Sequence, residues 1–142
     1  MEERLRLLLA IFLCLPMCAQ AELKSLTAHP NQSTYYHAVR CMGLLGSIID
    51  WTGKERLADL HPILERKIKV LGVAGISAAM TEEQIRSIEN ARKILLEDFK
   101  ASVEMYVSRY RENYAGDGYG WQEDEIVKSD LIYCNAIADS LI

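Results

Sequence analysis

The spacing of the apolar residues constrains the fold of this chain more than any other feature of its sequence. Between residues 85 and 114 they recur at intervals of three and four, which is the period of an α-helix. About 30 residues at this period predict a helix of roughly 45–50 Å, because an α-helix rises 1.5 Å per residue. Alternating β-branched sequence and Asn-Gly hairpin signals are absent, so the sequence predicts an all-α protein. The long stripe consists of Ile85, Ile88, Leu95, Phe99, Val103, Tyr106, Tyr110 and Tyr114.

Start and stop signals place a first helix from near Gln32 or Ser33 to Trp51, with Gly53 as its stop signal. Its apolar face is broad enough to be buried on most sides. Gly43 and Gly46 lower its intrinsic helix propensity by about 1 kcal/mol each relative to alanine. We therefore expect these two glycines to mark places where the backbone of another helix comes close.

The middle of the chain predicts two further helices after a single turn at residues 54–60. Pro62 suits the first position of a helix, where its missing N–H has no intrahelical partner to lose. This second helix is expected to run toward Met80, with a break at Gly72 as the alternative to a continuous helix. Residues 81–84 read Thr-Glu-Glu-Gln, which is a capping-box pattern and predicts the start of the long third helix.

A glycine-rich loop is expected at residues 115–121, because three glycines in five positions disfavour a helix. The acidic residues 123–125 then favour the start of a last helix, whose apolar face contains Cys134. The prediction is a four-helix-type bundle with a long third helix around one core. It forms a single domain over residues 22–142, without a repeat or an interdomain linker.

Residues 1–21 have the layout of a secretory signal peptide. Two arginines precede an apolar run at residues 7–15, and Ala19-Gln20-Ala21 supplies a small-x-small cleavage site. The run is shorter than the roughly 20 residues that a membrane span needs. We expect cleavage after Ala21, an exported protein in the periplasm or outside the cell, and no stable membrane insertion afterwards. Lipid attachment at Cys18 is the alternative.

Two of the four cysteines, Cys41 and Cys134, lie outside this leader. In an oxidising compartment such a pair usually forms a disulfide, and two free buried thiols are the alternative. A bridge would close a loop of roughly 90 residues and stabilise the fold by about 4–5 kcal/mol. It would join the first and last helices.

The net charge of −4 argues against nucleic acid as a partner, because nucleic-acid binding calls for a basic patch or stripe. Catalytic and metal-binding patterns are also missing from the sequence. There is no Glu-x-x-His for a di-iron bundle, no Cys-x-x-Cys, no Gly-x-Ser-x-Gly and no P-loop. We therefore expect no cofactor, no metal site and no catalytic residue, and hence a protein that is not an enzyme.

The aromatic residues near the glycine-rich loop are the strongest candidates for binding a partner. Tyr119 and Trp121 lie between glycines, and Tyr114 and Asp117 immediately precede them. Tyrosine and tryptophan are enriched at binding hot spots. These four residues are the predicted partner-binding site, and the alternative is that Trp121 folds back to cap the end of the bundle.

Two pairs of segments carry a resemblance to a known class of proteins. They are residues 35–41 with 51–53, and residues 110–118 with 130–134. In these segments the chain resembles small exported all-helical proteins of proteobacteria, whose function is uncharacterised. The resemblance covers most of the chain after the leader and implies a bacterial periplasm. It also implies a cysteine in the first helix that faces a cysteine in the last.

A second resemblance, at the level of fold alone, is to periplasmic immunity proteins that block type VI amidase effectors. These are also small, exported and helical, with a disulfide, but no toxin-contacting motif can be matched to this sequence. The sequence thus predicts a protein-interaction module of the cell envelope that binds an unknown envelope protein. An immunity protein and a bundle that binds a small ligand or metal are the alternative functions.

Overall fold

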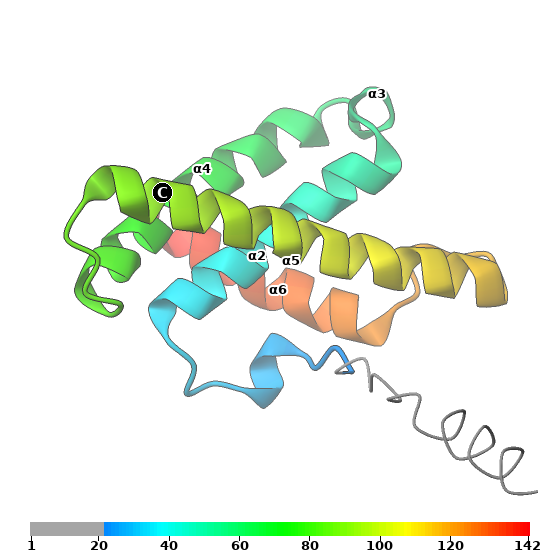
Figure 1. Cartoon of the computed structure of the whole chain (residues 1–142). Helices are drawn as coiled ribbons and strands as arrows, with labels where there is room; N and C mark the ends of the chain where they lie inside the picture. Colours follow the sequence, from blue (N-terminus) through cyan, green and yellow to red (C-terminus); the bar gives the residue numbers. More distant parts are fainter. Residues whose placement is uncertain (1–21) are drawn as a thin grey trace, which may run out of the picture.

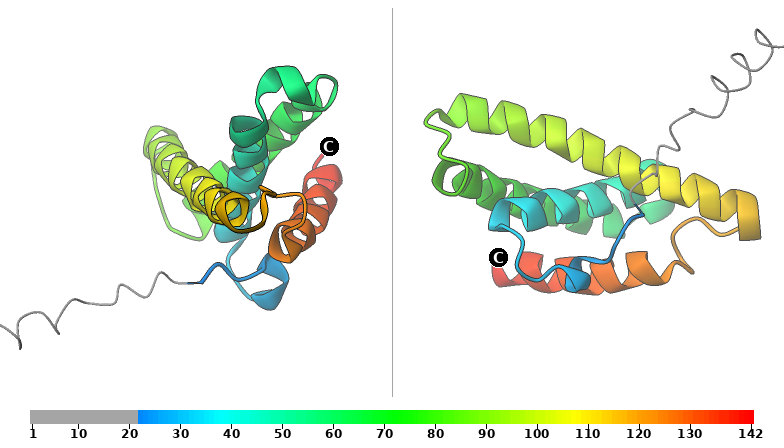
Figure 2. Two further views of the ribbon diagram at one scale, coloured as in Figure 1. Left: turned by 90° about the vertical axis from the view of Figure 1, so that its right-hand side faces the viewer. Right: turned by 60° about the horizontal axis from the view of Figure 1, so that its bottom comes forward.

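Helix α2 (Thr34–Thr52) runs through the middle of the protein, and the other long helices pack around it (Figures 1 and 2). The computed structural model describes residues 22–142, so the predicted leader and Cys18 lie outside the described residues. The described part is helical without a β-strand, which confirms the all-α prediction. The other elements are η1 (Leu26–Ala28), α3 (Lys54–Leu57), α4 (Leu60–Thr81), α5 (Ile88–Asp117) and α6 (Glu125–Ser140).

The central helix begins and ends at the predicted signals. The Ser33 side chain accepts a hydrogen bond from the backbone N–H of Tyr36 at the start of α2. At the other end Gly53 has a φ of 83°, a backbone conformation that favours glycine, and its N–H donates to the Ile49 carbonyl. Ten of the 19 residues of α2 are buried, which confirms the prediction of a helix covered on most sides.

The predicted capping box at residues 81–84 is wrong. Thr81 is the last residue of α4, where its hydroxyl donates back to the Ser77 carbonyl. The Glu82 carboxylate instead accepts from the backbone N–H groups of Thr34 and Tyr35, so it caps the start of α2. The long helix α5 begins later, at Ile88, and the side chain of Ser87 caps it by accepting from the Asn90 N–H.

Two other helix boundaries also differ from the expectation. Pro62 is the third residue of α4, not the first. The helix runs on through Gly72 as expected, so the alternative of a break there is wrong. At the other end of α5 the helix extends to Asp117, so the first three residues of the predicted loop are helical. Gly118, with a φ of 82°, ends α5 by donating its N–H to the Tyr114 carbonyl.

The disulfide between Cys41 and Cys134 joins α2 to α6, and both residues are completely buried. This confirms the predicted pairing of the first and last long helices, and the alternative of two free thiols is wrong. Tyr106 and Tyr110 from α5 are also completely buried and belong to the same core.

The two glycines of α2 mark a close approach to α5, as the sequence predicts. A Cβ atom added to Gly43 would lie 2.0 Å from the Ser102 hydroxyl and 2.9 Å from the Ser102 backbone carbon. A Cβ atom on Gly46 would lie 2.9 Å from the Phe99 ring. The two helices can therefore cross at this distance only because these positions lack side chains.

Replacing Gly43 by alanine is expected to lower the free energy of unfolding by about 1–3 kcal/mol, the usual penalty for overpacking a core. The neighbouring atoms belong to a short side chain and to backbone, so the helices themselves must separate. Gly116→Ala in α5 is the control, because its added Cβ would have nothing within 4 Å. It should leave stability unchanged or raise it by up to about 1 kcal/mol. Equal urea midpoints for the two variants would contradict the close crossing.

Candidate functional site

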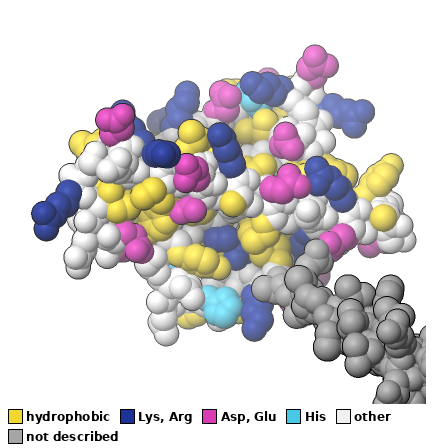
Figure 3. All heavy atoms as spheres, viewed as in Figure 1, with side chains coloured by type: hydrophobic (Ala, Val, Ile, Leu, Met, Phe, Trp, Pro, Cys, Tyr) yellow, Lys and Arg dark blue, Asp and Glu magenta, His cyan; other side chains and the backbone are white. Residues whose placement is uncertain are grey.

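An open groove of about 680 Å³ lies between α4 and α5, over the C-terminal half of α2. Its floor is apolar and its rim is charged, and apolar side chains lie between basic and acidic ones on this face of the molecule (Figure 3). The floor consists of Gly46, Ile49, Ile68, Phe99 and Val103. The rim consists of Asp50, Lys54, Glu65, Lys69, Lys100 and Glu104. We call these residues the groove.

The groove exists because α4 and α5 both pack on α2 but diverge from each other. Near the turn that joins them, the two helices touch where Leu95 fills the space over Gly75. Toward α3 they separate, as Figure 1 shows. On that side Gly46 has no side chain, so Phe99 and Val103 pack against the backbone of α2. The space between them and α4 stays open and forms the groove.

The rim residues carry three acidic and three basic groups, so the rim has no net charge. Glu104 is paired with Arg111 at 2.7 Å, and Glu65 lies 3.4 Å from the Nε2 atom of His61. Lys54, Lys69 and Lys100 form no ion pair with any of the described residues. These three ammonium groups are thus available to an occupant of the groove.

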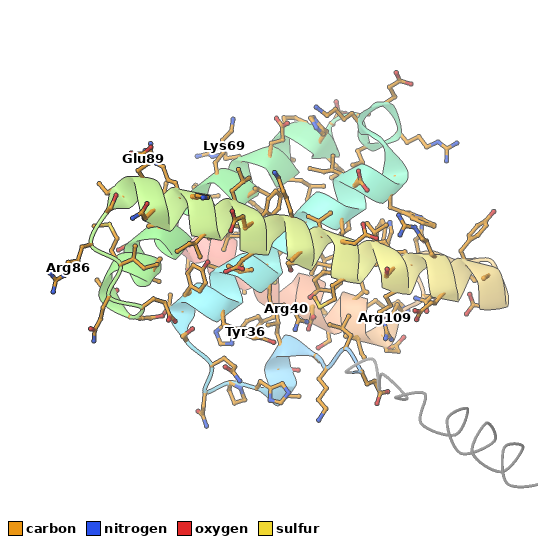
Figure 4. The ribbon with its side chains drawn as sticks, in the orientation of Figure 1. Tyr36, Arg40, Lys69, Arg86, Glu89 and Arg109 are labelled. Carbon is orange, nitrogen blue, oxygen red and sulfur yellow. A yellow bond between two sulfur atoms is a disulfide. The ribbon has the colours of Figure 1, made fainter. Side chains whose placement is uncertain are left out.

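A buried polar cluster links α2, α5 and α6 on the opposite side of α2 (Figure 4). One carboxylate oxygen of Asp130 accepts from the Arg40 guanidinium at 3.1 Å and from the Tyr106 hydroxyl at 2.7 Å. Arg40 also donates to the Tyr36 hydroxyl at 2.8 Å. Burial alone would lower the pKa of Arg40, but the neighbouring Tyr106, Tyr36 and Asp130 outweigh it and raise that pKa. Arg40 therefore stays charged inside the protein.

The same cluster holds the segment that precedes α2. The second carboxylate oxygen of Asp130 accepts from the Leu26 backbone N–H at 2.6 Å and from the Ser25 hydroxyl at 3.0 Å. Arg40 donates to the Lys24 carbonyl at 3.2 Å. Because both oxygens of the buried carboxylate have partners, the cluster anchors the segment before α2 to α6.

Sequence reasoning missed this cluster, although weak signals for it are present. Arg40 interrupts the apolar face of α2 immediately before Cys41, and Asp130 lies one helical turn before Cys134. A charge at a core position implies a buried partner. The two residues are 90 positions apart in the chain, so only the folded structure shows that they meet.

The predicted partner-binding residues are only partly brought together. Tyr114 and Tyr119 are 61% and 56% exposed, and the Asp117 side chain accepts from the Tyr119 N–H at 3.2 Å. Trp121 is half-buried, and its indole N–H donates to the Thr52 hydroxyl at 3.2 Å. Trp121 thus packs against the end of the bundle, while the two tyrosines and Asp117 remain at the surface.

Asp124 organises the corner between α5 and α6. Its carboxylate caps α6 by accepting from the N–H groups of Ile126 and Val127, and it also accepts from Arg109 and Asn113. Burial alone would raise the pKa of Asp124, but the Arg109 guanidinium and the other donors outweigh it and lower that pKa. The corner is therefore built around an ionised carboxylate.

The ionised state of Asp124 predicts a pH-dependent contribution to stability. A carboxyl group whose pKa is lowered by folding stabilises the protein above its unfolded pKa of about 4, and this contribution is lost as the pH falls through the folded pKa. Asp124→Asn keeps an amide oxygen that can cap α6 but cannot be ionised. We expect the variant to melt below the wild type at pH 7, with the difference shrinking toward pH 3. A constant difference in melting temperature across this range would contradict the claim that the ionised form of Asp124 stabilises the fold.

Within residues 22–142, no three His, Cys, Asp or Glu side chains come together in a way that could hold a metal ion. None of the helices in this part of the chain is both long enough and apolar enough to cross a membrane. No protein-family model, curated protein or solved structure matches the chain.

Proposed function

We propose that this protein is an exported, non-enzymatic interaction module of the bacterial cell envelope, which binds a partner protein in the groove. The observation that carries the proposal is an open hollow with an apolar floor and a charged rim. Exposed apolar surface rimmed by polar residues is typical of sites where another molecule binds.

The shape of the groove favours a protein segment over a small molecule. Pockets for small ligands usually enclose 70–90% of the ligand surface. A hollow that stays open between two diverging helices leaves one side of any occupant uncovered. Amphipathic helices bind in this way, because they bury one apolar face and leave the other in water.

The charges of the rim favour a protein segment as well. A membrane with anionic lipids or a nucleic acid would call for a surplus of basic residues. Here acids and bases are equal in number around the apolar floor. A segment that carries both signs of charge, as most protein surfaces do, fits this rim best.

The proposal that the protein is exported is supported by two independent features. Disulfides persist in oxidising compartments and are rare in the cytosol, and Cys41 and Cys134 are bridged. The first 21 residues read as a leader for secretion. An immunity protein that blocks a type VI amidase effector is one specific form of such a module, and the toxin would then occupy the groove.

The exposed tyrosines provide a second surface for the same partner. Tyr114 and Tyr119 are exposed at the end of α5 and just after it, Asp117 accepts a hydrogen bond from the Tyr119 N–H, and Trp121 is bonded to Thr52. Partner binding by Tyr114, Asp117 and Tyr119 stays a prediction. Trp121 is half-buried and offers less surface to a partner than these residues do.

The proposed function is tested by affinity capture from the envelope fraction of the source bacterium. The tagged wild type should retain one partner protein, and Lys69→Glu/Lys100→Glu should lose at least about 80% of it, since both changes alter the rim. Lys24→Glu/Arg86→Glu is the matched control, because both residues are exposed and neither lines the groove; Figure 4 labels Arg86. Unchanged capture by the groove variant would contradict the proposal.

A further inference from the structure

The rim of the groove is divided along its length into a basic end and an acidic end. α4 and α5 run in opposite directions and touch at Gly75 and Leu95. Lys69 lies six residues before Gly75, and Lys100 lies five residues after Leu95. At 1.5 Å per residue these are about 9 and 7.5 Å from the contact, so the two lysines lie at the same level on opposite walls.

The acidic residues occupy the next level along the groove, toward α3. Glu65 and Glu104 each lie one helical turn beyond the lysine of their own wall. Asp50 lies at the same level. The Met42 side chain of α2 lies against Gly72 of α4. Asp50 is eight residues after Met42, and Glu65 is seven residues before Gly72, so both lie about the same distance from this contact. Lys54 also lines the groove; it starts α3, past the chain reversal at Gly53, beyond the level of the three acidic residues.

Like charges thus face each other across the groove, lysine opposite lysine and glutamate opposite glutamate. Two helices that used these residues to bind each other would place opposite charges opposite one another. No ion pair crosses the groove among the described residues, and Lys69 and Lys100 have none at all. The arrangement therefore fits an occupant that lies between the walls, with acidic groups near the lysines and basic groups near the glutamates.

We propose that the groove binds an amphipathic helix whose charges are segregated, with acidic side chains in one half and basic side chains in the other. This inference rests on the proposed function and adds the chemistry of the bound segment. Apolar side chains on one face of this helix contact Phe99, Val103 and Ile68, and its two charged halves meet the two ends of the rim. A helix of uniform charge gains attraction at one end and meets repulsion at the other.

The test uses two synthetic helical peptides of identical composition and about 18 residues, which is five turns. Both place leucine at positions i, i+3, i+4 and i+7. One carries glutamates in its first half and lysines in its second, and the other interleaves them. We expect the segregated peptide to bind the mature protein at least about fivefold more tightly in fluorescence polarisation. The difference should shrink in 0.5 M salt, because exposed charges are screened.

The variant Lys69→Glu/Lys100→Glu makes both ends of the rim acidic. It should abolish the preference for the segregated peptide and bind a third peptide, with lysine at all charged positions, more tightly than the wild type does. Lys24→Glu/Arg86→Glu changes the net charge equally and should keep the wild-type preference. Equal binding of the first two peptides, a preference for the interleaved one, or no binding of either would overturn the inference. The capture experiment decides the proposed function separately, because it does not depend on these peptides.

Discussion

Asp130→Ala is expected to lower the free energy of unfolding by about 3–5 kcal/mol, the range for breaking a buried ion pair by removing one partner. The change leaves the Arg40 guanidinium buried without its carboxylate partner, and a guanidinium stays charged in proteins. It also removes the acceptor of the Leu26 N–H and the Ser25 hydroxyl, so the segment before α2 loses its anchor. Urea unfolding followed by circular dichroism measures the effect.

Asp139→Ala is the matched control for this prediction. Asp139 pairs with Lys67 at 2.9 Å, but its side chain is 61% exposed. Exposed pairs of this kind contribute about 0–1 kcal/mol. A second comparison replaces both partners, as Arg40→Met/Asp130→Leu, and should regain much of the stability because no buried charge remains unpaired. If Asp130→Ala unfolds at the same urea concentration as Asp139→Ala, the cluster does not hold the fold together.

Cys41→Ala/Cys134→Ala is expected to lower the free energy of unfolding by about 4–5 kcal/mol, because the bridge spans 93 positions and long loops lose the most entropy on closure. For a domain of this size the loss corresponds to a fall in melting temperature of roughly 15–20 °C. Scanning calorimetry of the wild type and the variant measures this fall directly.

The wild type treated with reductant serves as the control for the disulfide. Once mass spectrometry shows complete reduction, its melting temperature should approach that of the variant, while the variant should not respond to reductant. A fully reduced wild type that melts at the original temperature would contradict a stabilising role. Because Arg40 adjoins Cys41 and Asp130 lies one turn from Cys134, we expect the two losses to be non-additive when combined.

The sequence predicts those parts of the fold that depend on local signals. Ser33 and Gly53 bound α2 because a cap and a left-handed stop act within a few residues. The same local reasoning fails at residues 81–84, because the Glu82 carboxylate caps a helix that lies far away in the sequence. A capping pattern in the sequence therefore does not identify the helix whose N-terminus it caps.

The candidate site was beyond the reach of sequence reasoning for a similar reason. The groove depends on the divergence of α4 and α5, and no residue pattern encodes the angle between two helices. The floor residues Phe99 and Val103 belong to the predicted apolar stripe, but the stripe does not reveal that one edge of it stays open. The loop residues were found from composition, yet burial of Trp121 depends on Thr52 in another helix.

The measurement that tests the central claim most directly is site-specific photo-crosslinking in the envelope fraction. A benzophenone amino acid is placed at position 100 on the rim of the groove or at position 119 in the exposed loop. If the groove is the binding surface, position 100 should form a crosslink to one partner protein, and Lys69→Glu should weaken it. A partner crosslinked at position 119 alone would contradict the account and assign binding to the tyrosine loop.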